Sequence, residues 1–216
     1  EDLMEKLHAD CYPVISPGNR FGIPNSDWKE WTTFGGAKAF VPGKFNTTPS
    51  ASGEIYMYPE ADLSCPPSAR MPKGGFYFDT IVRQKPIDES NLDPADNMED
   101  FTPISEVMLE VQKEHVESLH ENTDYAIVYS MPGTSLGNIA MVPAPWLKSP
   151  KGIRDLEEWY ISHVIRKDYI YEVYRRQTDL AIENLRKVRD AFQNRIDIIY
   201  ISGTDFGSQR GPIFSP

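Results

Sequence analysis

The stretch Ile196-Asp197-Ile198-Ile199-Tyr200-Ile201-Ser202 runs directly into the polar loop Gly203-Thr204-Asp205-Phe206-Gly207-Ser208-Gln209. Its first part is dominated by isoleucine, and an apolar run of this length is typical of a strand buried on both faces of a parallel sheet. The loop would then lie at the carboxyl end of the strand, where α/β proteins place binding and catalytic groups. The stretch therefore predicts an α/β fold with functional residues in this loop.

The chain before this strand alternates between predicted helices and apolar strands. A long helix is expected over 168–193, a buried strand over 124–130, and a helix over 102–122 that Thr102 caps and Pro103 begins. This alternation predicts a parallel sheet covered by helices. The expected inward-facing residues are Val107, Val111, His115 and Leu119 in the first helix, and Ile170, Val173, Tyr174, Ala181, Leu185, Val188 and Phe192 in the second.

The 18–85 segment has a different character, because it is rich in Gly, Pro and aromatic residues arranged in short alternating runs. Strands are predicted over 38–41, 54–58 and 76–81, the first two as antiparallel strands. Trp28 and Trp31 are expected to pack beneath them as core aromatics. We interpret the segment as a β-rich insertion within a single domain that spans residues 1–216.

Composition excludes some classes of protein. The 216 residues carry a net charge of −10, and twelve acids against two bases between Lys85 and Asp124 account for all of it. An acidic chain without a basic stripe is not expected to bind nucleic acid. No apolar run reaches the roughly 18 residues that a membrane span needs.

Cysteine usage and the first residues of the chain indicate a cytoplasmic protein. The start, Glu1-Asp2-Leu3-Met4-Glu5-Lys6, is charged and has no apolar segment of a signal peptide. Two cysteines, Cys11 and Cys65, are too few for a disulfide scaffold, so a reduced compartment is expected. Neither cysteine shows ligand-like spacing with a histidine, so no metal site is predicted within the chain.

Gly133-Thr134-Ser135-Leu136-Gly137 matches the Gly-x-Ser-x-Gly pattern of a nucleophile elbow, between a predicted strand and a helix. A hydrolase would also need an acid and a histidine on separate downstream loops, but His163 lies in a helical stretch with the nearby acids. We therefore expect Gly133 and Thr134 to let the backbone approach a ligand closely, and not Ser135 to act as a nucleophile.

The 203–209 loop carries the stronger chemical signal. Asp205 follows a buried strand, where partial loss of solvent raises the pKa of a carboxyl group, and Thr204 and Gln209 add hydrogen-bonding groups. An alternative stays open in which Asp205 only caps a following helix. Farther back in the chain, Arg70 could bind an acidic substrate.

The same loop, together with Ser215-Pro216, resembles the Gly-x-Asp-x-Gly-Thr-Gln…Ser-Pro segment of the uroporphyrinogen decarboxylase superfamily. It is most similar to the branch that includes corrinoid-dependent methyltransferases. Three further parts of the chain carry the resemblance: Arg20-Phe21-Gly22 with Trp28, Met57-Tyr58-Pro59-Glu60 through Arg70-Met71-Pro72-Lys73-Gly74-Gly75, and Val142-Pro143-Ala144-Pro145-Trp146 with Lys151-Gly152-Ile153-Arg154.

The resemblance implies a (β/α)8 barrel of the TIM type, of which this chain would be the N-terminal part. It implies methyl transfer linked to a corrinoid (cobalamin) carrier, with a small molecule or a corrinoid protein as the partner. Asp205 would be the catalytic-site anchor, with Thr204, Gln209, Gly133, Thr134 and Arg70 binding substrate. Zinc is also implied for a complete protein, but its His-x-Cys and later Cys ligands would fall beyond Pro216.

Two alternatives remain open at this point. One is decarboxylation of a tetrapyrrole, although the arginines and the early Asp that bind it in that branch have no match here. The other is a non-catalytic truncated fragment or binding module, which is expected to self-associate because an incomplete barrel leaves sheet edges unpaired. The sequence therefore does not decide whether the chain is an enzyme.

Overall fold

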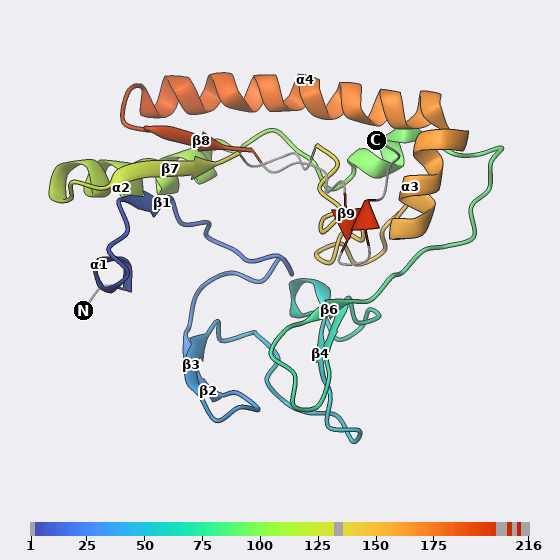
Figure 1. Ribbon diagram of the computed structural model, residues 1–216, viewed down its shortest axis with the longest axis horizontal. Coiled ribbons are helices and arrows are strands. Elements are labelled where there is room, and N and C mark those ends of the chain that lie inside the picture. The colour runs from blue at the N-terminus through green and yellow to red at the C-terminus, as the bar shows by residue number, and fades with distance from the viewer. Residues whose placement is uncertain (1–2, 132–135, 202–206, 209–210, 213–216) are drawn as a thin grey trace. The chain divides into compact units, whose positions relative to one another are not determined.

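The computed structural model describes residues 3–131, 136–201, 207–208 and 211–212, and the chain divides into two compact units (Figure 1). Unit 1 comprises Glu1–Ser16, Phe101–Asn138 and Tyr174–Pro216. Unit 2 comprises Pro17–Asp100 and Ile139–Val173, so it contains the whole β-rich 18–85 segment.

Unit 1 is built on a three-stranded parallel sheet. The strands are β1 (Cys11–Pro13), β7 (Ala126–Ser130) and β8 (Ile198–Tyr200), in the order β1-β7-β8. Figure 1 shows β7 and β8 side by side. The predicted α/β class with a parallel sheet is confirmed. The described residues form no closed barrel, so a complete (β/α)8 barrel stays a prediction.

The helix α2 (Glu106–Asn122) begins later than the sequence predicted. The Ser105 hydroxyl accepts a hydrogen bond from the Met108 amide at 3.2 Å, which makes Ser105 the N-cap. The prediction that Thr102 caps this helix was therefore wrong. Ser105 is the N-cap because it stands three residues before Met108, whose amide has no partner within the first turn of the helix.

The buried face of α2 was predicted only in part, since Leu119 is buried as expected but two valines are not. Val107 is 75% exposed and Val111 is 48% exposed, although both were expected to face inward. The helix instead buries Leu109, Gln112, Val116 and Leu119. Gln112 can lie inside because its side-chain oxygen accepts a hydrogen bond from the buried hydroxyl of Tyr129 at 2.8 Å.

The core of unit 1 lies between one face of β7 and two helices. Ile127 and Tyr129 alternate along β7 and pack with Val188 and Phe192 from α4 (Lys167–Phe192). Burial raises the pKa of Tyr129 to about 12, so its hydroxyl remains a donor to Gln112. The predicted helix over 168–193 and its positions at Val188 and Phe192 are confirmed, whereas Leu185 of the expected stripe is exposed.

The strand β8 is not buried on both faces. The prediction that the apolar run 196–202 forms a doubly buried strand was therefore wrong. Ile198 is 46% exposed and Ile199 is 37% exposed, and Tyr200 and Ile201 are exposed as well. β8 is the edge strand of the described sheet and pairs only with β7 there, so fewer neighbouring residues cover its side chains than cover those of the central strand β7. Its apolar character therefore reflects a surface that another element could cover.

Unit 2 contains antiparallel strands. β2 (Lys29–Thr32) pairs with β3 (Lys38–Val41), while β5 (Ala69–Met71) lies between β4 (Ile55–Met57) and β6 (Asp79–Thr80). The expected β-rich character is confirmed, but the strand predicted over 76–81 is reduced to Asp79–Thr80. The segments 38–41 and 54–58 do not pair with each other, because each joins its own small sheet.

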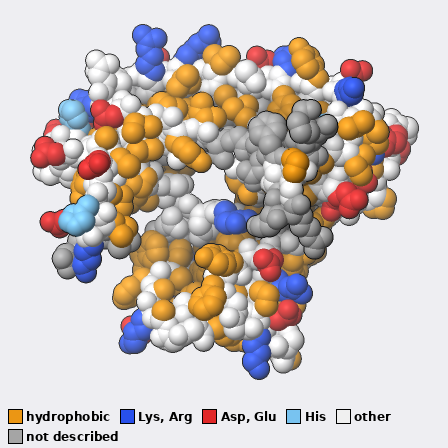
Figure 2. Space-filling model, in the orientation of Figure 1, with side chains coloured by type: hydrophobic (Ala, Val, Ile, Leu, Met, Phe, Trp, Pro, Cys, Tyr) orange, Lys and Arg blue, Asp and Glu red, His pale blue; other side chains and the backbone are white. Residues whose placement is uncertain are grey.

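Aromatic rings form the core beside these strands. Phe45 and Phe78 lie at right angles with ring centres 5.6 Å apart, and Phe21 contacts both. Trp31 lies 6.4 Å from Phe45, but Trp28 is 56% exposed and is not the core residue that was predicted. Figure 2 shows hydrophobic side chains also at the surface over these strands.

The remaining elements are short, apart from one helix in unit 2. They are α1 (Leu3–Lys6), the 3₁₀ helices η1 (Pro59–Ala61) and η2 (Pro94–Met98), α3 (Leu156–Ile165), and the paired strands β9 (Gly207–Ser208) and β10 (Gly211–Pro212). In the parts of the chain that the structure describes, no helix combines the length and apolar character needed to cross a membrane.

Candidate functional site

The carboxyl ends of β7 and β8 meet at one edge of the sheet in unit 1. Ser130 is paired with Tyr200, and the Met131 amide donates to the Tyr200 carbonyl at 3.1 Å. Adjacent strands lie about 4.8 Å apart, so the two loops that follow start as neighbours. Residues after both strands can therefore share one site at this edge.

Five of the six candidate site residues follow β7 or β8 in the sequence or stand between β9 and β10. Gly133, Thr134, Thr204, Asp205 and Gln209 all lie outside the described residues. Their neighbours in the chain are placed, and the register of β7 and β8 brings the starts of both loops to the same edge. The roles predicted for the five side chains remain predictions.

The sixth nominated residue, Arg70, lies on β5 in unit 2. Its guanidinium is 3.4 Å from a carboxylate oxygen of Glu54, and its side chain is about half exposed. The other oxygen of Glu54 accepts a hydrogen bond from the Tyr56 hydroxyl at 2.7 Å. This bond, followed by one from Ser52 and then the charge of Arg70, lowers the pKa of Glu54. Glu54 therefore already neutralises part of the arginine's charge.

A hollow of about 420 Å³ opens beside Arg70. It is lined by Tyr56, Arg70, Asp79, Thr80 and Ile81. The Asp79 carboxylate contributes a negative charge to the same wall, so the hollow carries both signs of charge. This arrangement does not favour an anionic ligand over a neutral one, and it gives no support to the prediction that Arg70 binds an acidic substrate.

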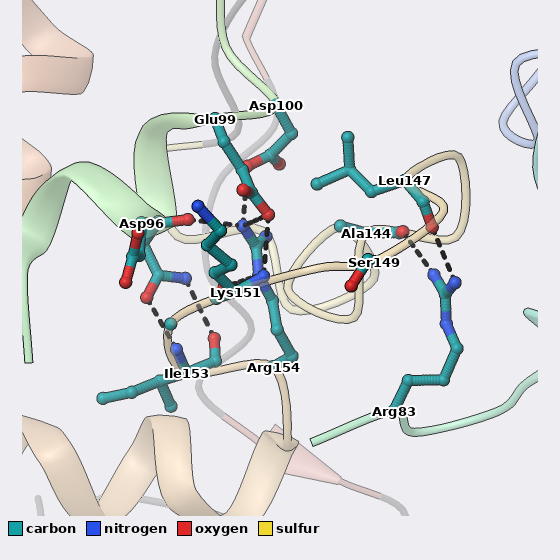
Figure 3. Close-up of polar contacts among 12 residues, drawn as sticks. Arg83, Asp96, Glu99, Asp100, Ala144, Leu147, Ser149, Lys151, Ile153 and Arg154 are labelled. Atoms are coloured by element: carbon teal, nitrogen blue, oxygen red, sulfur yellow. Dashed lines mark hydrogen bonds and ion pairs between the residues drawn. The ribbon is translucent and has the colours of Figure 1, made fainter. Parts of the chain in front are cut away.

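The most extensive polar network of unit 2 surrounds Arg154 (Figure 3). The side chain is 1% exposed, and its guanidinium faces the carboxylates of Glu99 and Asp100 at 3.4 and 3.1 Å. It also donates to the carbonyl groups of Lys151, Val142 and Asp96. These contacts use the guanidinium to hold three backbone segments together, so the arginine is structural and does not face a ligand.

Asp100 is buried almost as completely as its partner. Burial raises the pKa of its carboxyl group, even though the charge of Arg154 and a hydrogen bond from it act in the opposite direction. One of its oxygens pairs with Arg154, while the other is buried without a hydrogen-bond partner. The pair therefore depends on the arginine, because no other side chain compensates the carboxylate.

Hydrogen bonds of the Asn97 side chain fix the backbone next to Arg154. The amide of Asn97 both donates to and accepts from Ile153, at 2.9 and 2.8 Å. Gly152 has a φ of 75°, and a Cβ there would lie 2.4 Å from the Asn97 oxygen and 3.1 Å from the Tyr169 hydroxyl. Only glycine fits this position. The Tyr169 hydroxyl donates a third hydrogen bond, to the same Asn97 oxygen, at 2.6 Å.

Two residues of the 81–85 stretch bind the same region. Arg83 donates to the carbonyls of Ala144 and Leu147 at 2.8 and 2.6 Å (Figure 3). The Gln84 oxygen accepts from the amides of Arg154 and Asp155 at 2.6 and 3.0 Å. Together with the Arg154 and Asn97 contacts, these bonds fix the 142–155 backbone.

Sequence reasoning did not single out this network as a unit. Arg154 carried only the resemblance of its segment, and the roles of Asn97, Asp100 and Gln84 were not predicted. The one signal in the sequence is the Lys151-Gly152-Ile153-Arg154 motif, where a glycine indicates a special backbone position.

The described residues contain no group of three or more His, Cys, Asp or Glu side chains that could hold a metal ion. Cys11 and Cys65 are both free thiols, one in each unit. Comparison with known proteins adds no assignment, since no family model, curated protein or solved structure matches the chain.

Proposed function

We propose that this chain forms part of a (β/α)8 enzyme of the uroporphyrinogen decarboxylase type that transfers a methyl group to or from a corrinoid carrier. The proposal rests on the resemblance of four sequence segments. It is supported by the parallel order β1-β7-β8 and by the helices that connect these strands. Barrels of this class use the loops after their strands as the site.

The register of β7 against β8 is the observation that carries the proposal. Because Ser130 pairs with Tyr200, the loop that contains Gly133 and Thr134 begins beside the loop that contains Thr204 and Asp205. In the proposed enzyme Asp205 is a polar anchor for the substrate. In that role, the backbone at Gly133 and Thr134 would face it, and Thr204 and Gln209 would complete the hydrogen bonds.

A zinc ion would activate a thiol acceptor in an enzyme of this kind. The described residues do not fit such an ion, because they offer no cluster of ligands. No step is therefore assigned to zinc in this chain. The chain's own contribution is to bind and orient the substrate at the β7–β8 edge.

The test is a methyl-transfer assay on the natural full-length protein that contains this chain. The probe is methylcobalamin with a small thiol, followed by the change in cobalamin absorbance. Asp205→Ala should lower turnover at least about tenfold, as expected for loss of a charged hydrogen-bonding group. Asp190→Ala, an exposed acid on α4, is the matched control and should leave turnover unchanged.

Three outcomes would count against the proposal: no methyl transfer, equal turnover in the two variants, or release of carbon dioxide when the protein is incubated with uroporphyrinogen instead. The last would support the decarboxylase alternative. The proposal also includes a cytoplasmic location, which the two free cysteines, Cys11 and Cys65, support.

A second candidate function is that of a self-associating binding module. The specific observation is β8, whose large apolar side chains are exposed at a sheet edge. Edge strands of this kind tend to recruit another strand. This function requires no catalytic residue, so substitutions in the strand separate it from the enzymatic proposal.

A further inference from the structure

A small hollow in unit 2 combines an apolar floor with two lysines. Its volume is about 200 Å³. Ile23 and Met57 form part of its lining and are fully buried, and Phe45 and Tyr58 contribute aromatic rings. Lys29 and Lys44 add two positively charged side chains to the lining.

Strand alternation explains why a lysine points to this apolar region. On β2, Lys29 and Trp31 are both partly buried, while Glu30 and Thr32 between and after them are exposed. Side chains two residues apart in a strand share a face, so Lys29 lies on the same side as Trp31. Trp31 in turn contacts Phe45 of the hollow. The stem of Lys29 therefore runs along aromatic surface, as long basic side chains often do.

The turn after β3 brings the second lysine to the same hairpin. Lys29 is directly paired with Val41, and Lys44 follows Val41 by three residues. Neither ammonium group forms an ion pair or a side-chain hydrogen bond with any residue that the structure describes. Two positive charges thus border the hollow without an ion pair to any carboxylate that the structure describes.

Most of the nearby acids are engaged with other bases, whereas Asp27, which lies against Gly43, accepts a hydrogen bond from the Ser26 hydroxyl at 3.0 Å. Glu30 pairs with Lys38 at 3.1 Å across the β2–β3 hairpin. Glu60 and Asp62 both bind Lys148, at 3.0 and 2.9 Å. These pairs leave the two lysines of the hollow available to an external anion.

Asn46, whose side-chain amide also lines the hollow, is already occupied. Its side-chain nitrogen donates to the Tyr56 carbonyl at 2.7 Å, and its side-chain oxygen accepts from the Thr48 amide at 3.1 Å. A ligand's polar group would therefore be recognised by the lysines and not by this amide.

We propose that this hollow binds a small aromatic carboxylate. A cavity of about 150 Å³ lined by apolar side chains is large enough for benzene, so one six-membered ring fits here. The ring would lie beside the side chains of Phe45, Tyr58 and Leu63, above the buried Ile23 and Met57. The carboxylate would bind the ammonium groups of Lys29 and Lys44. This site is separate from the residues of the proposed methyl-transfer site and does not depend on that function.

The test is a titration of the complete chain with benzoate, followed by the amide signals of Ile23, Phe45 and Met57 in NMR spectra. Two probes each lack one half of the ligand: benzyl alcohol keeps the ring without the charge, and acetate keeps the charge without the ring. Benzoate should bind at least about tenfold more tightly than either, because it alone satisfies both parts of the hollow.

The double variant Lys29→Gln/Lys44→Gln should weaken benzoate binding at least tenfold. Lys73→Gln, at an exposed lysine elsewhere in unit 2, is the matched control and should bind as the natural chain does. Circular dichroism and the unfolding midpoint establish that each variant is folded. Absence of benzoate binding, equal binding of benzyl alcohol, or unchanged binding in the folded double variant would each overturn the proposal.

Discussion

Arg154 illustrates how one buried charge can hold several backbone segments. Its guanidinium contacts two carboxylates and three carbonyl groups, and its removal leaves the Asp100 carboxylate buried without a cation. We expect Arg154→Met to lower the free energy of unfolding by about 3–5 kcal/mol, the usual cost of breaking a buried ion pair from one side. Urea unfolding followed by circular dichroism measures this loss.

The control for this prediction is an arginine in an exposed ion pair. Arg175 pairs with Asp179 one helical turn away, and both side chains are about half exposed or more. Arg175→Met should cost at most about 0.5 kcal/mol, because solvent screens such pairs. Equal losses in the two variants would show that burial of the Arg154 network contributes nothing special.

His115 should make the stability of unit 1 depend on pH. Its Nδ1 accepts a hydrogen bond from the Ile15 amide at 3.2 Å, and burial lowers the pKa of its imidazole. The folded protein therefore prefers the neutral ring. Its stabilising contribution is complete above the unfolded pKa of about 6.5 and is lost as the pH falls through the lowered folded pKa.

Histidine substitutions test the direction of this pH dependence of stability. In His115→Gln, which retains an acceptor but does not titrate, the decrease in unfolding free energy from pH 7 to pH 5 should be smaller than in the natural chain. His120→Gln changes an exposed histidine of the same helix and should preserve the natural pH dependence. A profile that His115→Gln leaves unaltered would contradict the assignment.

The N-terminus of the helix α2 allows two candidate N-cap residues, Ser105 and Thr102, to be compared. Ser105→Ala should cost about 1 kcal/mol, because it removes the acceptor for the Met108 amide. Thr102→Ala, at the position that the sequence pattern favoured, should cost much less. Thermal or urea unfolding of the two variants ranks them, and a larger loss for Thr102→Ala would show that the helix begins where the sequence predicted.

The elements show where sequence patterns sufficed and where they failed. The pattern placed α4 and β7 correctly, because their apolar spacing is strong and their lengths are typical. It misplaced the buried face of α2, where a polar residue, Gln112, is buried by its bond to Tyr129 while two valines remain outside. Hydrophobicity alone cannot reveal a hydrogen bond that lets a polar side chain lie in the core.

For the molecule as a whole, the edge strand β8 predicts self-association. Ile198, Ile199 and Tyr200 expose apolar surface beside backbone groups that face away from β7. We expect the natural chain to form larger species as its concentration rises, and Ile199→Asp to suppress them, because a charge on an edge strand opposes pairing. Sedimentation velocity at a series of concentrations measures the effect.

A matched substitution distinguishes association through the β8 edge from nonspecific hydrophobic association. Val164→Asp replaces an exposed apolar residue of α3, in unit 2, and should leave the association unchanged. If both substitutions act equally, or if the natural chain sediments as one species at every concentration, the β8 edge does not drive association.

The candidate site was predicted only in part by the sequence. The position of Asp205 and of Gly133 after two strands follows from local patterns, and the register of β7 and β8 brings those loops to one edge. The Arg154 network could not be foreseen, because a buried arginine and an exposed one look the same in a sequence. Its partners Asp96, Glu99 and Asp100 lie more than fifty positions away, in what the sequence presents as an acidic, solvated loop.

The pairing of Cys11 with Ala126 also has a consequence for the order of folding. The chain must be synthesised through most of unit 2 before β1 meets its partner, and β8 joins β7 only after α4 has been made. Each doubling of the intervening length adds about 0.6 kcal/mol to the entropic cost of closing such a loop. Local hairpins such as β2–β3 should therefore form early, and the parallel sheet should be the slow step in which a nascent chain depends most on a chaperone.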